Sequence, residues 1–119
     1  PDGTCVRDYI HVLDLAEAHI AALDVLAEGR QPDHHTYNVG TGLGTSVREI
    51  IEGLRRVIGW DFPVEELDRR AGDPPKLIGD PLSIGVDLGW KANNGVEEIL
   101  TSAWEGWQAG PRPITVPGA

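Results

Sequence analysis

The sequence predicts an α/β fold with three short strands and about four helices. Two observations support this: runs with helical periodicity alternate with short β-prone runs, and capping patterns mark several helix starts. With 119 residues, 40% of them hydrophobic, the chain has room for a single domain. The elements are expected in the order strand, helix, strand, helix, strand, helix, helix.

The first strand and helix are expected before residue 30. Residues 6–12 carry β-favouring side chains interrupted by charges, which predicts a short strand or extended segment. Asp14 with Glu17 three positions later forms a capping pattern, which predicts a helix over residues 15–28. Gly29 follows as a stop signal.

A second strand and helix are expected in the middle of the chain. Residues 36–39 are β-prone and are followed by the glycine-rich loop 40–44. Ser46 and Glu49 form a second capping box, and apolar residues at helical spacing continue to Gly59. We therefore expect a helix that begins after Ser46 and ends at Gly59.

The last elements are expected to be one strand and two helices. Residues 62–67 alternate as an edge strand does, and the breaker-rich residues 68–75 predict a loop. Asp80 and Pro81 predict the start of a short helix that Gly89 ends. Asn94 and Glu97 form a third capping pattern, which predicts a final helix to about residue 108, before a frayed tail over 110–119.

The charge balance narrows the classes of partner. Ten Lys and Arg residues stand against 19 Asp and Glu residues, giving a net charge of -9 and a pI of about 4.7. Such a chain is not expected to bind nucleic acid or an anionic membrane surface. Placed arginines can still create a local site for a small anion.

Cysteine and histidine usage argues against a disulfide or a metal centre. Cys5 is the only cysteine, and the histidines at 11, 19, 34 and 35 show no metal-binding spacing. No apolar run approaches the length of a membrane span, so a cytoplasmic protein is expected. The opening turn Pro1-Asp2-Gly3-Thr4 without methionine suggests a piece of a longer protein.

Two arginine-containing segments are candidates for anion binding. In the loop 69–75, Arg69 and Arg70 precede a Gly-Asp turn at Asp73, and such a group can present a guanidinium fork to a phosphate. The alternative is a solvated turn with a local Arg–Asp pair. Arg7 lies in a β-like segment, where it faces a cleft or forms an ion pair with a carboxylate of residue 8, 14 or 73.

Other conspicuous residues favour structural roles. The loop 40–44 is similar to an anion cradle, but it lacks a phosphate-loop lysine and is interpreted as a turn. His11 and His19 are interpreted as structural histidines rather than ligands, His19 lying on the apolar face of its helix. The four tryptophans are expected in the core or at its rim.

Several of these motifs, in this order, resemble the C-terminal part of the UDP-glucose 4-epimerase family, a group of extended short-chain dehydrogenases/reductases. The resemblance covers nearly the whole chain to about residue 108, and its two most specific blocks are VRDYIHV at 6–12 and RRAGDP at 69–74. The other matching blocks are DGT at 2–4, DLA at 14–16, AH at 18–19, YNVGTG at 37–42, SVRE at 46–49 and LGWK at 88–91.

The resemblance implies that residues 1–109 form a small substrate-binding part without a Rossmann domain. It assigns Arg7, Arg70 and Asp73 to binding the UDP portion of a nucleotide sugar. An aromatic residue frequent in the family shortly after this aspartate is replaced, since Lys76 and Leu77 stand nearby. Family members use NAD and a Tyr-x-x-x-Lys pair to epimerise the sugar. This chain lacks both that pair and the NAD-binding glycine motif, so we expect no cofactor and no catalytic residue here.

The resemblance also implies partners. The helix over 15–28 is expected to face the missing Rossmann part, so the chain alone exposes apolar surface or covers it by self-association. UDP-sugar binding is expected to be weak, because half of the cleft is missing. The alternatives are a fragment of another nucleotide-sugar epimerase, dehydratase or decarboxylase, or a self-associating module without a ligand.

Overall fold

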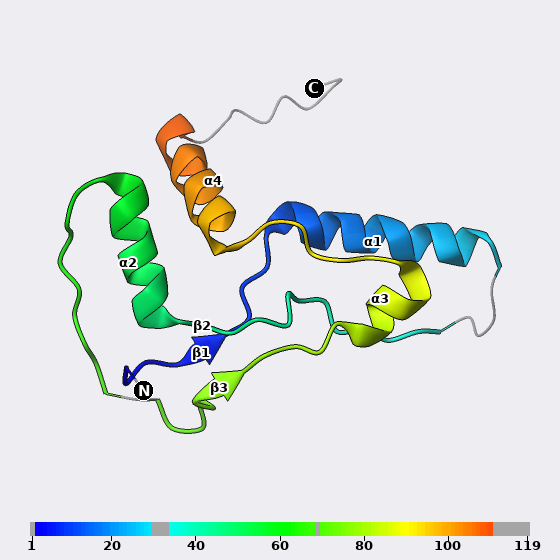
Figure 1. The fold of residues 1–119 in the computed structure, drawn as a ribbon, viewed down its shortest axis with the longest axis horizontal. Helices are drawn as coiled ribbons and strands as arrows, with labels where there is room; N and C mark the ends of the chain where they lie inside the picture. Colours follow the sequence, from blue (N-terminus) through cyan, green and yellow to red (C-terminus); the bar gives the residue numbers. More distant parts are fainter. Residues whose placement is uncertain (1, 30–33, 69, 111–119) are drawn as a thin grey trace, which may run out of the picture.

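A computed structural model describes residues 2–29, 34–68 and 70–110. Across these ranges the chain forms three strands and four helices, which follow one another in the order that the sequence predicts, although two of the strands occupy other segments (Figure 1). The elements are β1 (Val6–Arg7), α1 (Val12–Ala27), β2 (Thr45–Ser46), α2 (Val47–Ile58), β3 (Lys76–Leu77), α3 (Leu82–Leu88) and α4 (Val96–Ala109).

The sheet is small and mixed, with the strand order β2-β1-β3. In β1, Val6 lies opposite Ser46 of the antiparallel β2 and opposite Lys76 of the parallel β3. Each strand has only two residues. The sheet therefore acts as a junction where three distant segments meet rather than as a layer that helices cover.

The predicted strands over 36–39 and 62–67 are wrong, and the strand predicted over 6–12 shrinks to β1. Both edges of β1 are already occupied, by residues 45–46 and by residues 76–77. A strand exists only where a neighbour completes its hydrogen-bond ladder. Among the described residues, the segments 36–39 and 62–67 have no such neighbour and stay irregular.

Helix α1 begins earlier than its capping pattern predicts. The N-cap is His11, whose Nδ1 accepts a hydrogen bond from the Leu13 N–H at 3.1 Å. Asp14, the predicted cap, lies in the first helical turn and is completely buried. The prediction failed because the side chain of Asp14 binds a distant segment instead of its own helix terminus.

Helix α2 confirms its predicted boundaries. The Ser46 hydroxyl accepts a hydrogen bond from the Glu49 N–H at 3.1 Å, and the Glu49 carboxylate accepts one from the Ser46 N–H at 2.7 Å. At the other end, Gly59 adopts a left-handed conformation with φ +82°. Both ends of α2 are thus fixed by residues within the helix or next to it.

Helix α3 ends at Gly89, as predicted, with φ +66° at that glycine. Its start differs by one position, because Pro81 is the N-cap and Leu82 is the first helical residue. Asp80 still contributes, since its carboxylate accepts the Leu82 N–H at 3.0 Å.

The capping pattern predicted for α4 is wrong. The helix begins after Gly95, whose N–H donates to the Glu98 carboxylate at 2.9 Å. Asn94 is not the cap, because its side chain donates to Asp14 at 2.9 Å. A contact between distant segments again replaces a local one. The helix extends to Ala109, and the predicted tail beyond residue 110 lies outside the described residues.

The buried core is small. Its main cluster is Ala18 of α1, Ile84 of α3 and Trp90, and the Trp90 indole donates a hydrogen bond to the Asp14 carbonyl at 3.1 Å. Leu100 of α4 is buried separately. Trp90 is therefore in the core as predicted, whereas Trp60 and Trp107 are 57% and 79% exposed.

The molecule is spread out for its length. Its radius of gyration is 18.0 Å, against about 13 to 14 Å for a compact domain of this size. Figure 1 shows α2 and α4 side by side at one end, with α1 and α3 together at the other. Helix α1 exposes large apolar side chains at Val12, Leu13, Ile20, Leu23 and Leu26.

Candidate functional site

Two of the predicted anion-binding residues meet in the structure. Arg7 ends β1, and its Nη2 lies 2.8 Å from Oδ1 of Asp73, which precedes β3. The Arg7 Nη1 also donates to the Val6 carbonyl at 2.9 Å. Of the three carboxylates considered for Arg7, the structure thus selects Asp73. The pair is reached by solvent, with side chains 24% and 44% exposed.

Arg70 lies at the start of the same turn. The Asp73 N–H donates to the Arg70 carbonyl at 3.3 Å, and Gly72 between them has φ +83°. Arg70 is exposed and is not among the residues that line the neighbouring pocket. Arg69 lies outside the described residues. The backbone of the turn therefore brings Arg70 near the Arg7–Asp73 pair, while its side chain stays at the surface.

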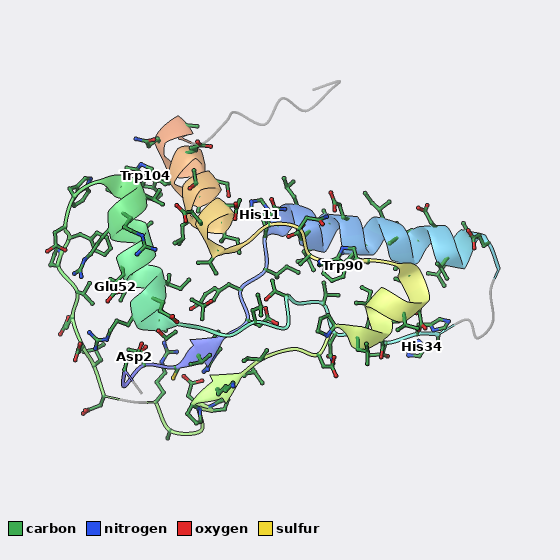
Figure 2. The ribbon with its side chains drawn as sticks, in the orientation of Figure 1. Asp2, His11, His34, Glu52, Trp90 and Trp104 are labelled. Carbon is green, nitrogen blue, oxygen red and sulfur yellow. The ribbon has the colours of Figure 1, made fainter. Side chains whose placement is uncertain are left out.

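An open pocket of about 800 Å³ extends from this pair. It lies between α2 and the irregular segment 61–67, beside the N-terminal residues 2–5 (Figure 2 labels Asp2 and Glu52). The lining residues are Asp2, Gly3, Thr4, Cys5, Arg7, Val47, Arg48, Ile51, Glu52, Arg55, Asp61, Phe62, Pro63, Val64, Glu65, Glu66, Leu67 and Asp73.

Two further arginines of the pocket connect α2 to the segment 61–67. Arg48 of α2 pairs with Glu66 at 3.0 Å, and Arg55 pairs with Asp61 at 2.6 Å. The Arg55 guanidinium also lies 5.5 Å from the centroid of the Phe62 ring. The Arg55 Nε is buried and forms no hydrogen bond, so its contact with Asp61 is an ion pair without hydrogen-bond geometry.

These pairs were not predicted from the sequence, and no spacing rule connects α2 to the segment that follows it. Each of the pocket arginines 7, 48 and 55 already forms an ion pair with a carboxylate. An anionic ligand must therefore share the arginine with that carboxylate or displace the carboxylate from it. Exposed ion pairs of this kind contribute only about 0 to 1 kcal/mol each. Their rearrangement is therefore compatible with ligand binding.

The N-terminal wall of the pocket is organised by Asp2. Its carboxylate accepts hydrogen bonds from the Thr4 N–H and hydroxyl at 2.9 and 2.8 Å, and from the Ser46 hydroxyl at 2.6 Å. The hydrogen bonds from Ser46 and Thr4 lower the pKa of Asp2 to about 2. Asp2 thereby links the chain start to the residue that caps α2.

The glycine-rich loop 40–44 binds an anion that belongs to the chain itself. The Asp8 carboxylate accepts hydrogen bonds from the Thr41 N–H at 2.9 Å, the Thr41 hydroxyl at 2.6 Å and the Gly42 N–H at 3.0 Å. A dinucleotide pyrophosphate needs free N–H donors in such a loop. These donors are occupied, so the loop does not fit an NAD pyrophosphate.

The burial and the hydrogen-bond partners of His11 and His19 test their interpretation as structural residues. His11, which Figure 2 labels at the start of α1, is buried. Its Nε2 lies 2.9 Å from the Ser102 hydroxyl, and its Nδ1 accepts a backbone N–H. Because Nδ1 is the acceptor, Nε2 carries the proton and cannot activate Ser102 as a nucleophile. His11 is structural, as predicted. His19 is exposed rather than packed, with its Nδ1 2.7 Å from the Leu15 carbonyl.

Asp14 was predicted to cap a helix, but the structure gives it a different role. It is 0% exposed and accepts hydrogen bonds from the Asn93 and Asn94 N–H groups at 3.2 and 3.0 Å. Burial raises the pKa of Asp14, but the hydrogen bonds from Asn94 and Asn93 outweigh it and lower the pKa below its usual value. Its role is to tie α1 to the segment before α4.

Within the described ranges, no group of three or more His, Cys, Asp or Glu residues is arranged to hold a metal ion. In the same part of the chain, no helix combines the length and apolar character that a membrane crossing requires.

Comparisons with known proteins match this chain chiefly to UDP-sugar 4-epimerases. The sequence profile of the NAD dependent epimerase/dehydratase family matches residues 1–40. A UDP-glucose 4-epimerase of Rhizobium leguminosarum bv. trifolii is 45% identical over 108 residues, which are 91% of this chain and 32% of the relative. The corresponding enzyme of Bacillus subtilis is 44% identical and is covered to 31%.

Solved structures agree with the sequence comparison. A UDP-glucose 4-epimerase of Bifidobacterium longum in complex with NAD+ and UDP matches with a TM-score of 0.78 and 38% identity, over 92% of this chain and 31% of that one. A second UDP-glucose 4-epimerase structure matches with a TM-score of 0.87 and 41% identity, over 98% and 35%. The chain thus spans about a third of the length of these relatives, and in sequence and fold it matches one part of the UDP-glucose 4-epimerases.

Proposed function

We propose that residues 1–109 are the C-terminal substrate-binding part of a UDP-glucose 4-epimerase and contribute the UDP-sugar-binding side of its active site. The observation that supports this is the meeting of Arg7 with Asp73 at the edge of an 800 Å³ pocket. The likeness to a structure described as a complex with NAD+ and UDP adds support. In this proposal the ligand is the UDP moiety.

The three site residues have distinct roles in the proposal. Arg7 and Arg70 carry delocalised cations whose N–H groups match the oxygens of a diphosphate. Asp73 cannot favour an anion, so its role is to accept a hydrogen bond from a ribose hydroxyl. Without ligand, Asp73 instead neutralises Arg7 at 2.8 Å. Binding therefore exchanges one carboxylate partner of Arg7 for a phosphate.

The redox chemistry is assigned to residues outside this chain. Loop 40–44, whose sequence is similar to an anion cradle, donates the N–H groups of Thr41 and Gly42 to Asp8. The sequence has no Tyr-x-x-x-Lys pair to supply a base. NAD and the proton-transferring residues belong to the remainder of a longer protein. The isolated chain is therefore expected to bind UDP weakly and to be inactive.

The missing remainder is also the proposed partner of α1. The large apolar residues at 12, 13, 20, 23 and 26 of α1 are exposed, whereas Ala18 of the same helix faces the core. A helix that is apolar both toward the core and on its exposed surface normally lies between two packed layers. In the complete protein the second layer is the Rossmann part, and in isolation it is another copy of the chain. The proposal places the protein in the cytoplasm, where the single Cys5 stays reduced.

Calorimetric titration with UDP tests the binding role. The wild-type chain should release heat at high micromolar to millimolar UDP, and Arg7→Ala, Arg70→Ala or Asp73→Ala should each reduce the affinity. Arg56→Ala is the matched control, because Arg56 is an exposed arginine of α2 that belongs neither to the pocket lining nor to the turn that carries Asp73. No heat from the wild type at millimolar UDP, or equal loss in the Arg56 variant, would overturn the proposal.

A second candidate differs only in the sugar. Relatives described as a putative UDP-arabinose 4-epimerase and a bifunctional UDP-glucose and UDP-xylose 4-epimerase, both of Arabidopsis thaliana, are 44% and 42% identical. All of these names share the UDP portion. Turnover of several UDP-sugars by the full-length parent would separate the candidates, while UDP binding by this chain is expected under each.

A further inference from the structure

We infer that Asp8 is a positioning residue that holds Arg7 in place for the diphosphate, and that the glycine-rich loop 40–44 serves this purpose. The inference rests on the proposed function, because it assumes that Arg7 meets the ligand. Asp8 itself makes no contact with the ligand. Its part is to fix the short piece of backbone from which the Arg7 side chain extends toward Asp73.

The Asp8 carboxylate is held by four hydrogen bonds from two distant segments. Oδ1 accepts from the N–H and the hydroxyl of Thr41 at 2.9 and 2.6 Å, and Oδ2 accepts from the N–H groups of Gly42 and Gly79 at 3.0 and 3.3 Å. Both oxygens are thus used. We call Asp8 with these donors the Asp8 clasp. Hydrogen bonds to a charged acceptor are shorter and stronger than neutral ones.

Close packing around the clasp requires glycine at two positions of the loop. A Cβ added to Gly40 would lie 2.5 Å from Oδ2 of Asp8. A Cβ added to Gly44 would lie 2.5 Å from Ile78 and 2.6 Å from Val6. The loop backbone therefore lies directly against both residues that flank Arg7 in the sequence. This closeness, rather than a phosphate ligand, explains the glycines.

The clasp supplies what the sheet lacks. Strand β1 has two residues, so its ladder alone holds the Arg7 backbone at few points. Successive side chains along an extended segment point to opposite sides. The Asp8 clasp therefore anchors one side of the chain while Arg7 extends on the other to Asp73. Releasing the clasp frees the backbone at Arg7 and lets the guanidinium move.

Thr41 offers a direct test, because its hydroxyl can be removed while its N–H remains. At nearly constant volume, Thr41→Val loses the 2.6 Å hydrogen bond to Asp8 and the 3.1 Å hydrogen bond from the Leu43 N–H, and Thr41→Ser retains both. We expect Thr41→Val to weaken UDP binding by about threefold to tenfold, the loss typical of one hydrogen bond. Thr41→Ser should bind as the wild type does, and circular dichroism should show both variants folded.

A double-mutant cycle separates positioning from a general structural effect. If Thr41 acts through Arg7, then Thr41→Val should change UDP affinity little in an Arg7→Ala background. An equal loss in both backgrounds would overturn the inference. Asp8→Asn provides a second variant, since its amide turns an N–H donor toward backbone donors. It should behave as Thr41→Val does if it folds.

A ligand-free measurement keeps the inference distinct from the proposed function. The side-chain Nε–H resonance of Arg7, assigned by its loss in Arg7→Lys, should shift and broaden in Thr41→Val but not in Thr41→Ser. If no variant binds UDP while this resonance responds, the proposed function fails and the positioning by Asp8 stands. An unchanged Arg7 resonance in Thr41→Val would overturn the positioning itself.

Discussion

The Asp14 carboxylate of α1 accepts the backbone N–H of Asn94 at 3.0 Å, across 80 positions of sequence. The same carboxylate accepts the Asn94 side-chain amide at 2.9 Å. A fully buried charge is tolerated only when such donors surround it. This contact joins the end of the molecule formed by α1 and α3 to the end formed by α2 and α4.

The first prediction concerns this contact. Asp14→Asn should destabilise the chain by roughly 2 to 4 kcal/mol, because one oxygen becomes a donor that faces backbone N–H groups. Asp24→Asn is the control, since Asp24 is an exposed residue of the same helix. Urea denaturation would measure both variants. A change below about 0.5 kcal/mol in Asp14→Asn would contradict the role given to this carboxylate.

The second prediction concerns pH. The pKa of Asp2 is lowered from 3.8 to about 2, and that of Asp14 is also lowered. A carboxyl group whose folded pKa is depressed stabilises the fold above its unfolded pKa. That stabilisation is lost as the pH falls through the folded pKa.

Thermal midpoints between pH 6 and pH 2 should therefore be flat above about pH 5 and fall steeply below pH 4. Ser46→Ala removes the hydroxyl that donates to Asp2 at 2.6 Å. It should make the acid limb of the curve shallower. A variant curve parallel to that of the wild type would show that this hydrogen bond does not set the Asp2 pKa.

The third prediction concerns two helical glycines. A Cβ at Gly53 of α2 would lie 2.6 Å from Leu100 Cδ1, whereas a Cβ at Gly106 of α4 would meet nothing within 4 Å. Glycine inside a helix costs about 0.5 to 1 kcal/mol relative to alanine. Gly106→Ala should therefore stabilise the chain by that amount. Gly53→Ala should destabilise it, because the buried Leu100 side chain must shift to make room for the added methyl group.

Denaturant unfolding of both alanine variants checks this difference in sign. The double variant Gly53→Ala with Leu100→Ala should cost less than the sum of the two single changes, because the second substitution removes the clash. Strict additivity would mean that α2 and α4 do not pack through this pair.

The fourth prediction concerns the exposed apolar side of α1. Light scattering should show that the isolated chain associates at tens of micromolar, since large apolar patches on a monomer are rarely left open. Leu23→Glu with Leu26→Glu should shift the mass toward the monomer. Gln108→Glu, which adds a charge on α4, should not. A wild-type chain that is strictly monomeric would argue against self-association through α1.

The fifth prediction concerns turnover. The isolated chain with added NAD should not interconvert UDP-glucose and UDP-galactose in a coupled assay. Its sequence has no Tyr-x-x-x-Lys pair that could supply the catalytic base. A full-length relative, such as the Bacillus subtilis enzyme, serves as the positive control. Measurable epimerisation by this chain alone would overturn the assignment of chemistry to residues outside it.

Helix α2 shows what the sequence could predict. Ser46, Glu49 and Gly59 act on the helix that they flank, so spacing alone identifies both ends. The apolar periodicity and the number of elements likewise depend on interactions between residues that are close in sequence. The Arg7–Asp73 contact could be included among several possibilities, because its two residues are charged and stand out in their segments.

The strands and the start of α4 show what the sequence could not predict. Residues 62–67 alternate as a strand does, but strand formation depends on a neighbour that local pattern cannot identify. Asn94 fits a capping pattern, yet its amide donates to a carboxylate 80 positions earlier. The pocket wall could not be predicted for the same reason. Its Arg48–Glu66 pair joins a helix to an irregular segment, and no local sequence pattern identifies such a contact.

The Asp8 clasp has a consequence for how the chain folds. Its hydrogen bonds span 33 positions to Thr41 and 71 to Gly79. Closing such loops carries an entropic cost that a four-residue helical contact does not. Helices α1, α2 and α4 should therefore form early from local contacts, with the three strands joining last. The Arg7–Asp73 contact would then be completed only in the final step of folding, so the proposed binding of UDP would require the finished molecule.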